Sequence, residues 1–186
     1  NLMDVFSNII AVHVSEKQYE TAIARCDSHL EKIKASPVAA SIVLNLKGNL
    51  FVETGRLDQG KALYAQSIEK NPAYITPYMT LARLLTDEQD FQQAIKVYSD
   101  LLEQRPGLVA PHTLLGTLYE HQSDSEKAEA HYVKALEIQP DYVPAMNNLA
   151  FLYADQNRNL NKALDLAQQA KEKAGESLAI IDTLGW

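Results

Sequence analysis

The chain lacks most of the sequence features that mark enzymes, membrane proteins and nucleic-acid binders. Its 186 residues contain no Gly-rich phosphate loop, no pair of cysteines at metal-binding spacing and no nucleophile elbow. No apolar run approaches the roughly 18 residues of a membrane helix. The net charge of −7 comes without a basic stripe, so nucleic acid and anionic membrane surfaces are not expected partners. We therefore expect no enzyme, no cofactor, no bound metal and no membrane insertion by this segment.

The sequence has instead a clear internal period. Three tyrosines stand 34 residues apart, and three prolines keep the same interval: Tyr64, Tyr98 and Tyr132, then Pro72, Pro106 and Pro140. Small residues occupy a further column of the same period: Gly48, Ala82, Gly116 and Ala150. A period of about 20–50 residues is typical of solenoids and similar arrays. The chain is therefore expected to be an array of units that counts as one elongated domain.

The clearest unit resembles the tetratricopeptide repeat, whose pattern is W-x2-L-G-x2-Y, then A-x3-F, then P. The residues that carry this resemblance are His112, Leu115, Gly116, Tyr119, Ala128, Tyr132 and Pro140. His112 stands where the family has Trp, and Tyr132 stands where it has Phe. The resemblance implies an all-α fold, a right-handed superhelical solenoid of stacked antiparallel helix hairpins. The 86–90 stretch interrupts the helical spacing of apolar residues and predicts a turn between two such helices.

The same 34-residue period divides the chain into five repeats and the start of a sixth. A degenerate repeat at 1–40 is followed by repeats at 41–74, 75–108, 109–142 and 143–177, and 178–186 opens a truncated sixth repeat. The second repeat carries Gly60 where the pattern has Ala, which predicts a softer helix by about 0.5–1 kcal/mol. The fifth is one residue longer, and we expect the 157–159 turn to absorb that residue. Because the chain stops within the sixth repeat, we expect a fragment of a longer repeat protein.

The single cysteine and the five histidines predict no chemistry. Cys26 falls in a core column of the first repeat, so a buried and unreactive thiol is expected. His112 occupies a core column as well. His121 and His131 flank the turn of the fourth repeat and would face each other across the hairpin, but a metal site there needs a third ligand. Surface histidines are the expected result.

The resemblance places a binding groove along the first helix of each repeat, since stacked hairpins create an extended concave surface. Eight residues beside the Gly/Ala column are candidates to line this groove: Asn45, Met79, Thr113 and Asn147 three positions before it, and Asn49, Arg83, Thr117 and Phe151 one position after it. Amide side chains can bind a peptide backbone, and Arg83 can pair with a carboxylate. The sequence thus predicts a non-enzymatic scaffold that binds a peptide segment or a partner protein.

Two alternatives remain open at this stage. The uncapped C-terminal end exposes Ile181, Leu184 and Trp186, which predicts a homo-oligomer in a self-associating structural module. The chain can also be the regulatory arm of a larger protein. The 147–153, 162–167 and 182–186 segments resemble bacterial repeat proteins of envelope, exopolysaccharide and protein-sorting systems. This resemblance implies a bacterial assembly factor, with the cytoplasm and the periplasm both open as its location.

Overall fold

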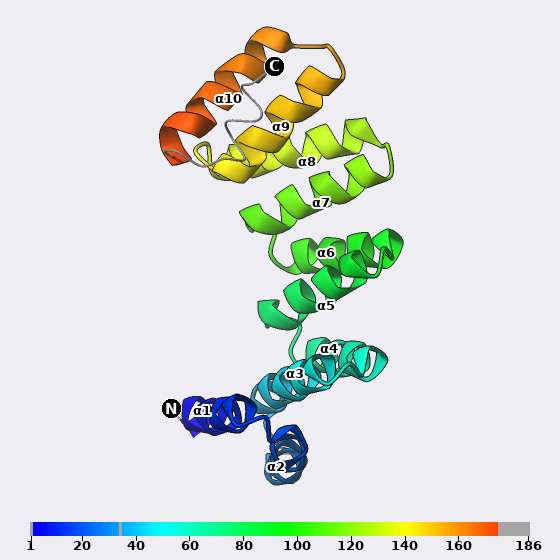
Figure 1. The fold of residues 1–186 in the computed structure, drawn as a ribbon, viewed down its shortest axis with the longest axis vertical. Helices are drawn as coiled ribbons and strands as arrows, with labels where there is room; N and C mark the ends of the chain where they lie inside the picture. Colours follow the sequence, from blue (N-terminus) through cyan, green and yellow to red (C-terminus); the bar gives the residue numbers. More distant parts are fainter. Residues whose placement is uncertain (1, 34, 175–186) are drawn as a thin grey trace. The chain divides into compact units, whose positions relative to one another are not determined.

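In the computed structural model, residues 2–33 and 35–174 are described, and they form ten α-helices and no strand (Figure 1). Short turns separate the two helices of each repeat, as the repeat pattern predicts. The helices are α1 (Leu2–Ser15), α2 (Tyr19–Lys32), α3 (Pro37–Glu53), α4 (Leu57–Lys70), α5 (Ile75–Asp87), α6 (Phe91–Gln104), α7 (Val109–His121), α8 (Ser125–Ile138), α9 (Val143–Asp155) and α10 (Leu160–Ala174).

Contacts divide the chain into two compact units, Asn1–Glu88 and Gln89–Trp186. In the first unit α1 packs on α2, α2 on α3, α3 on α4 and α4 on α5, and α1 also contacts α3. In the second unit α6 packs on α7, α7 on α8, α8 on α9 and α9 on α10, and α7 also contacts α9. The division falls in the turn between α5 and α6, within the predicted repeat 75–108.

A left-handed residue recurs at one position in the turn of every hairpin. These residues and their φ angles are Lys17 (57°), Gly55 (76°), Gln89 (63°), Ser123 (58°) and Asn157 (48°). In the α3–α4 and α7–α8 turns the next residue donates its N–H to a carbonyl near the end of the first helix. These bonds join Arg56 to Phe51 at 2.8 Å and Asp124 to Tyr119 at 2.9 Å. Such bonds satisfy carbonyls that a helix end leaves open, so each turn ends one helix and starts the next.

The extra residue of the fifth hairpin lies in its turn, as the sequence predicts. Three residues separate α7 from α8, whereas four separate α9 from α10. The longer turn has a second left-handed residue, Asn159, at φ 51°. Asparagine tolerates this conformation better than most residues do, so the insertion leaves both helices intact.

The glycines of the small column lie directly against buried tyrosine rings. A Cβ atom placed on Gly48 would lie 2.6 Å from Cε1 of Tyr64, and one on Gly116 would lie 2.3 Å from Cε1 of Tyr132. Both tyrosines are almost completely buried. The close helix approach that the small column predicts is therefore confirmed in the α3–α4 and α7–α8 hairpins.

Gly60 also allows a close approach, which changes the expectation made for it. A Cβ atom there would lie 2.6 Å from Cγ2 of Val52 and 3.2 Å from the carbonyl oxygen of Gly48. The gain in helix propensity from alanine is thus offset by crowding against α3. Cys26 fits its expectation: its side chain is fully buried, and burial raises the pKa of its thiol to about 12.

Candidate functional site

The predicted groove residues differ widely in their exposure. Asn45 and Thr113 are buried, with 3% and 5% of their surface exposed. Met79, Thr117 and Asn147 are partly buried. The exposed members are Asn49, Arg83 and Phe151. The column three positions before the small residue therefore lies deeper than the column one position after it, and the second column offers more of its side chains to a ligand.

Asn49 and Thr117 hold the tyrosines of their own hairpins. The Tyr64 hydroxyl donates to Oδ1 of Asn49 at 2.8 Å, and the Tyr132 hydroxyl lies 3.2 Å from Oγ1 of Thr117. Tyr132 also donates to the carboxylate of Glu120. These bonds link the two helices of each hairpin, a structural role that the column pattern alone does not reveal.

Arg83 has a carboxylate partner on its own helix. Its guanidinium lies 3.3 Å from Oδ2 of Asp87, one turn further along α5, and both side chains are mostly exposed. An exposed pair of this kind contributes little to stability. The arginine therefore remains able to exchange this partner for a carboxylate of a ligand at small cost.

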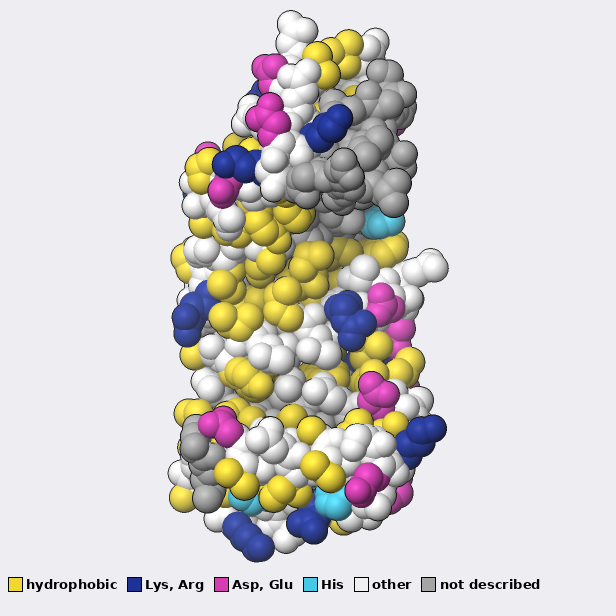
Figure 2. All heavy atoms as spheres, turned by 60° about the vertical axis from the view of Figure 1, so that its left-hand side comes forward, with side chains coloured by type: hydrophobic (Ala, Val, Ile, Leu, Met, Phe, Trp, Pro, Cys, Tyr) yellow, Lys and Arg dark blue, Asp and Glu magenta, His cyan; other side chains and the backbone are white. Residues whose placement is uncertain are grey.

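Two first helices of the second unit meet through a hydrogen bond between polar side chains. The Asn148 amide of α9 donates to Oγ1 of Thr117 of α7 at 3.3 Å. Leu114 lies one turn before Thr117 and is 37% exposed, and Phe151 lies one turn after Asn148 and is 44% exposed. Residues three apart share a helix face, so an exposed leucine and an exposed phenylalanine flank this bond. Figure 2 shows hydrophobic side chains at the surface among polar ones.

Sequence reasoning missed Leu114 and Asn148 as members of this surface. The signal for Leu114 lay in its column, where the neighbouring repeats have the polar residues Thr80 and Asn148. A large apolar residue where the neighbouring repeats have polar ones makes this position a candidate for a contact surface. The α7–α9 surface is defined here as Leu114, Thr117, Asn148 and Phe151.

One buried acceptor of the candidate groove makes no hydrogen bond to the described residues. It is Oδ1 of Asn45 on α3. Leaving a buried polar atom without a partner costs about 1–3 kcal/mol. A water molecule or an N–H group of a ligand is the kind of donor that would satisfy it.

The histidines pair differently from the arrangement expected across the fourth hairpin. His131 faces His112, with their Nδ1 atoms 3.1 Å apart, whereas His121 stacks on Phe91 with ring centroids 5.0 Å apart. The expectation that His121 and His131 face each other is therefore wrong. Nε2–H of His112 donates to the Pro106 carbonyl at 3.3 Å, so Nδ1 of His112 is the acceptor for His131.

Burial lowers the pKa of both paired histidines, that of His131 to about 4. The pair is therefore neutral at pH 7. Within residues 2–33 and 35–174, no group of three or more His, Cys, Asp or Glu side chains is arranged to hold a metal ion. Tyr119 stacks on His131 with ring centroids 5.4 Å apart, so the pair lies within the packing of the hairpin.

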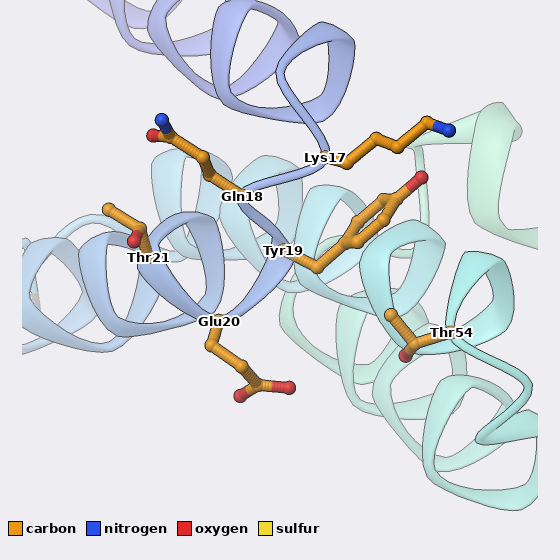
Figure 3. A pocket seen from close by; sticks show the side chains of 6 residues that line it. All are labelled: Lys17, Gln18, Tyr19, Glu20, Thr21 and Thr54. Atoms are coloured by element: carbon orange, nitrogen blue, oxygen red, sulfur yellow. The ribbon is translucent and has the colours of Figure 1, made fainter.

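A shallow pocket of about 300 Å³ lies beside the first turn of α2 (Figure 3). It is lined by Lys17, Gln18, Tyr19, Glu20, Thr21 and Thr54. Glu20 pairs with Arg56 at 2.8 Å, and the Thr54 hydroxyl donates to the Leu50 carbonyl at 2.9 Å. Glu20 is therefore paired with the α3–α4 turn, and Thr54 with the backbone at the end of α3.

The predicted self-association residues lie outside the described residues. These are Ile181, Leu184 and Trp186. No helix of the described part of the chain has both the length and the apolar character needed to cross a bilayer.

Comparison with known proteins agrees with the repeat and hairpin pattern. Three family models, each described as tetratricopeptide repeat, match residues 51–118, 111–142 and 131–169. Together they span more than half of the chain. The fold defines an all-α helical-repeat protein. Within that class, the chain belongs to the tetratricopeptide repeat family.

Solved structures of similar fold are also repeat proteins. A tetratricopeptide repeat protein from Parabacteroides merdae is 18% identical, with a TM-score of 0.78 over 97% of this chain and 70% of that one. YrrB, described as a TPR protein with an unusual peptide-binding site, is 16% identical, with a TM-score of 0.72 over 97% of this chain and 91% of that one. MamA from Desulfovibrio magneticus is 16% identical, with a TM-score of 0.70 over 94% and 97%. At these identities the likeness shows the fold alone: an all-α tetratricopeptide solenoid. A search of curated proteins gave no match.

Proposed function

We propose that this protein is a non-enzymatic scaffold for protein–protein interaction that binds a peptide segment or a partner protein along its first helices. The family supports the general role, because stacked hairpins present extended binding surfaces. The peptide-binding site named for YrrB belongs to that protein, and it supports the proposal only as a precedent within the same fold.

The observation that carries the proposal is the α7–α9 surface. Its apolar members, Leu114 and Phe151, are 37% and 44% exposed and flank the bond between Thr117 and Asn148. A peptide needs apolar contact for its side chains and polar partners for its backbone. The surface offers both within one turn of each helix. Of the remaining candidates, Asn49, Arg83 and Asn147 would contribute polar contacts and Met79 an apolar one, while Asn45 and Thr113 lie deeper in the helices.

Selection from a displayed peptide library tests this role. The selected peptides are then compared for binding to the wild type, a test variant and a control variant. The double variant Leu114→Ser with Phe151→Ser removes the two exposed apolar side chains and should weaken the peptides selected by the wild type at least tenfold. Val38→Ser is the control, because Val38 is an apolar residue of α3 with 58% exposure. Equal binding by all three proteins would overturn the α7–α9 assignment, whereas the absence of any selected peptide would overturn the scaffold role.

A further inference from the structure

A shallow hollow of about 250 Å³ lies between the second helices of the fourth and fifth hairpins, α8 and α10. Four of its lining residues are apolar and belong to one hydrophobic cluster, and of these four only Leu149 is buried. We call this site the α8–α10 hollow. Its six residues, none of them in the α7–α9 surface, are Val133, Leu136 and Glu137 of α8, Leu149 of α9, and Lys162 and Leu166 of α10.

The equivalent positions one repeat earlier have different residues. Ser99 of α6 stands 34 residues before Val133, and His131 of α8 stands 35 residues before Leu166 because of the insertion in the fifth hairpin. His131 is itself engaged by its contact with His112. The repeat therefore does not require an apolar lining at these two positions, and the apolar lining distinguishes α8 and α10 from α6 and α8.

The lysine of the hollow lacks the carboxylate partner that its counterpart has. Lys127 and Lys162 each lie over a tyrosine ring of their own hairpin, at 5.1 Å and 5.3 Å from the ring centroid. Lys127 pairs at 2.6 Å with Asp124, the residue directly before α8. The residue directly before α10 is the neutral Asn159. The Lys162 ammonium lies instead 3.4 Å from the Tyr153 hydroxyl.

Two carboxylates near Lys162 are already paired with other cations. Glu129 pairs with Arg158 at 2.7 Å, and Glu137 of the hollow pairs with Lys134 at 3.0 Å. Within the described part of the chain, these pairs leave the positive charge of Lys162 in excess. A carboxylate of a ligand can therefore bind Lys162 without displacing an ion-pair partner from it.

Continuation of the repeat beyond α10 would leave the hollow open. Helix α8 contacts α9 through Glu129, which accepts from the Tyr153 hydroxyl at 2.5 Å, and through Leu136, which packs in the cluster of α9 residues. The counterparts of Glu129 and Leu136 in α10, 35 residues further on, are Leu164 and Lys171. Neither of them lines the hollow. A further hairpin in the same register would therefore pack on a different part of α10.

We propose that the α8–α10 hollow binds a segment of a partner protein that has one large apolar side chain next to an aspartate or glutamate. The apolar side chain would contact Val133, Leu136 and Leu166, and the carboxylate would pair with Lys162. Sites for free small molecules usually measure about 300–1,000 Å³, so a hollow of about 250 Å³ suits a single side chain of a protein better. This site lies on the second helices and does not depend on the function proposed for the first helices.

Peptide selection on a chain without the apolar members of the α7–α9 surface tests this site. The target is the variant Leu114→Ser with Phe151→Ser, in which the hollow is unchanged. The peptides selected from a displayed library should carry a large apolar residue next to Asp or Glu. In the same background, Val133→Ser copies Ser99 and should weaken their binding about tenfold. Lys162→Gln should weaken it about two- to fivefold, as expected for an exposed ion pair.

The matched control is Lys127→Gln, because Lys127 already has Asp124 as its partner. Its binding of the selected peptides should equal that of the target. Replacing the acidic residue of a peptide by its amide should cost as much as Lys162→Gln, and the two changes together should cost no more than either alone. Circular dichroism checks that every variant keeps its helices.

Three outcomes would contradict the proposal. One is that the target selects no peptide, and another is that the selected peptides have no acidic residue. The third is that Val133→Ser and Lys162→Gln bind the selected peptides as well as the target does. None of these outcomes bears on the first-helix surface, whose test is the loss of peptides selected by the wild type when Leu114 and Phe151 are replaced.

Discussion

The α3–α4 and α7–α8 hairpins have the same frame and different chemistry at two equivalent positions. In both, a glycine of the first helix seats a buried tyrosine of the second, Gly48 with Tyr64 and Gly116 with Tyr132. At the positions where one hairpin has Leu44 and Leu63, the other has His112 and His131. The repeat pattern therefore determines the close approach of the two helix backbones, while neighbouring positions accept either leucine or a titratable histidine.

The largest effect is expected from filling the space under the tyrosine. Gly116→Ala would bring a Cβ atom to 2.3 Å from the Tyr132 ring, so we expect a loss of about 1–3 kcal/mol in unfolding free energy. Gly48→Ala should cost less, because its Cβ would lie 2.6 Å from the Tyr64 ring. Urea denaturation of both variants measures the difference.

Gly107 provides a matched control for this comparison. A Cβ atom there meets no other atom within 4 Å. Gly107→Ala should therefore leave stability unchanged or raise it slightly. An equal loss in all three variants would mean that the tyrosine contact is not the cause.

The next largest effect is expected from removing the tyrosine hydroxyls, and the loss of stability should differ between the two hairpins. Tyr132→Phe removes the donor to the Glu120 carboxylate, whose pKa burial already raises. Its expected cost is about 1.5–3 kcal/mol, as for a hydrogen bond to a charged group. Tyr64→Phe removes only a bond to the neutral Asn49 and should cost about 1 kcal/mol. Thermal unfolding of the two variants measures which substitution costs more stability, and a larger loss of stability in Tyr64→Phe would contradict this prediction.

Acid should weaken the histidine-bearing hairpin selectively. The pKa of His131 is lowered to about 4 in the folded chain, mainly by burial and then by the charge of His112. Protonation therefore favours the unfolded state, so this stability is present above about pH 6.5 and is lost as the pH falls toward 4. Allowing for solvent screening, we expect a loss of about 1 kcal/mol between pH 7.5 and pH 5.

Replacing the two histidines of the α7–α8 hairpin by leucines, as in the α3–α4 hairpin, tests the cause of this pH dependence. The double variant His112→Leu with His131→Leu should flatten the change in unfolding free energy between pH 7.5 and pH 5. Lys134 lowers the pKa of His112 through its charge, so Lys134→Gln is a useful control that should reduce the dependence only slightly. An unchanged slope in the double variant would assign the pH effect to other groups.

The sequence predicts the helix hairpins well because the same residue signals recur from one repeat to another. The small column, the tyrosine column and the extra residue before Leu160 all appear in the structure at the expected places. The pairing of His131 with His112 was not predicted, since it depends on side-chain rotation within one hairpin. The bonds from Asn49 and Thr117 to the buried tyrosines were also missed, because a column pattern does not reveal which side chains bond to each other.

The smallest expected effect lies in the turns of the two hairpins, at their shared left-handed position. The α3–α4 turn has Gly55 at φ 76°, where glycine carries no steric penalty, whereas the α7–α8 turn has Ser123 at φ 58°. Ser123→Gly should therefore stabilise the chain by about 0.5 kcal/mol, and Gly55→Ser should destabilise it by about 1 kcal/mol. Urea denaturation of both variants measures these changes. With the slope of the transition unchanged, the midpoint should rise in Ser123→Gly and fall in Gly55→Ser. A loss of stability in Ser123→Gly would mean that the greater freedom of glycine in the unfolded chain outweighs the relief of strain in this turn.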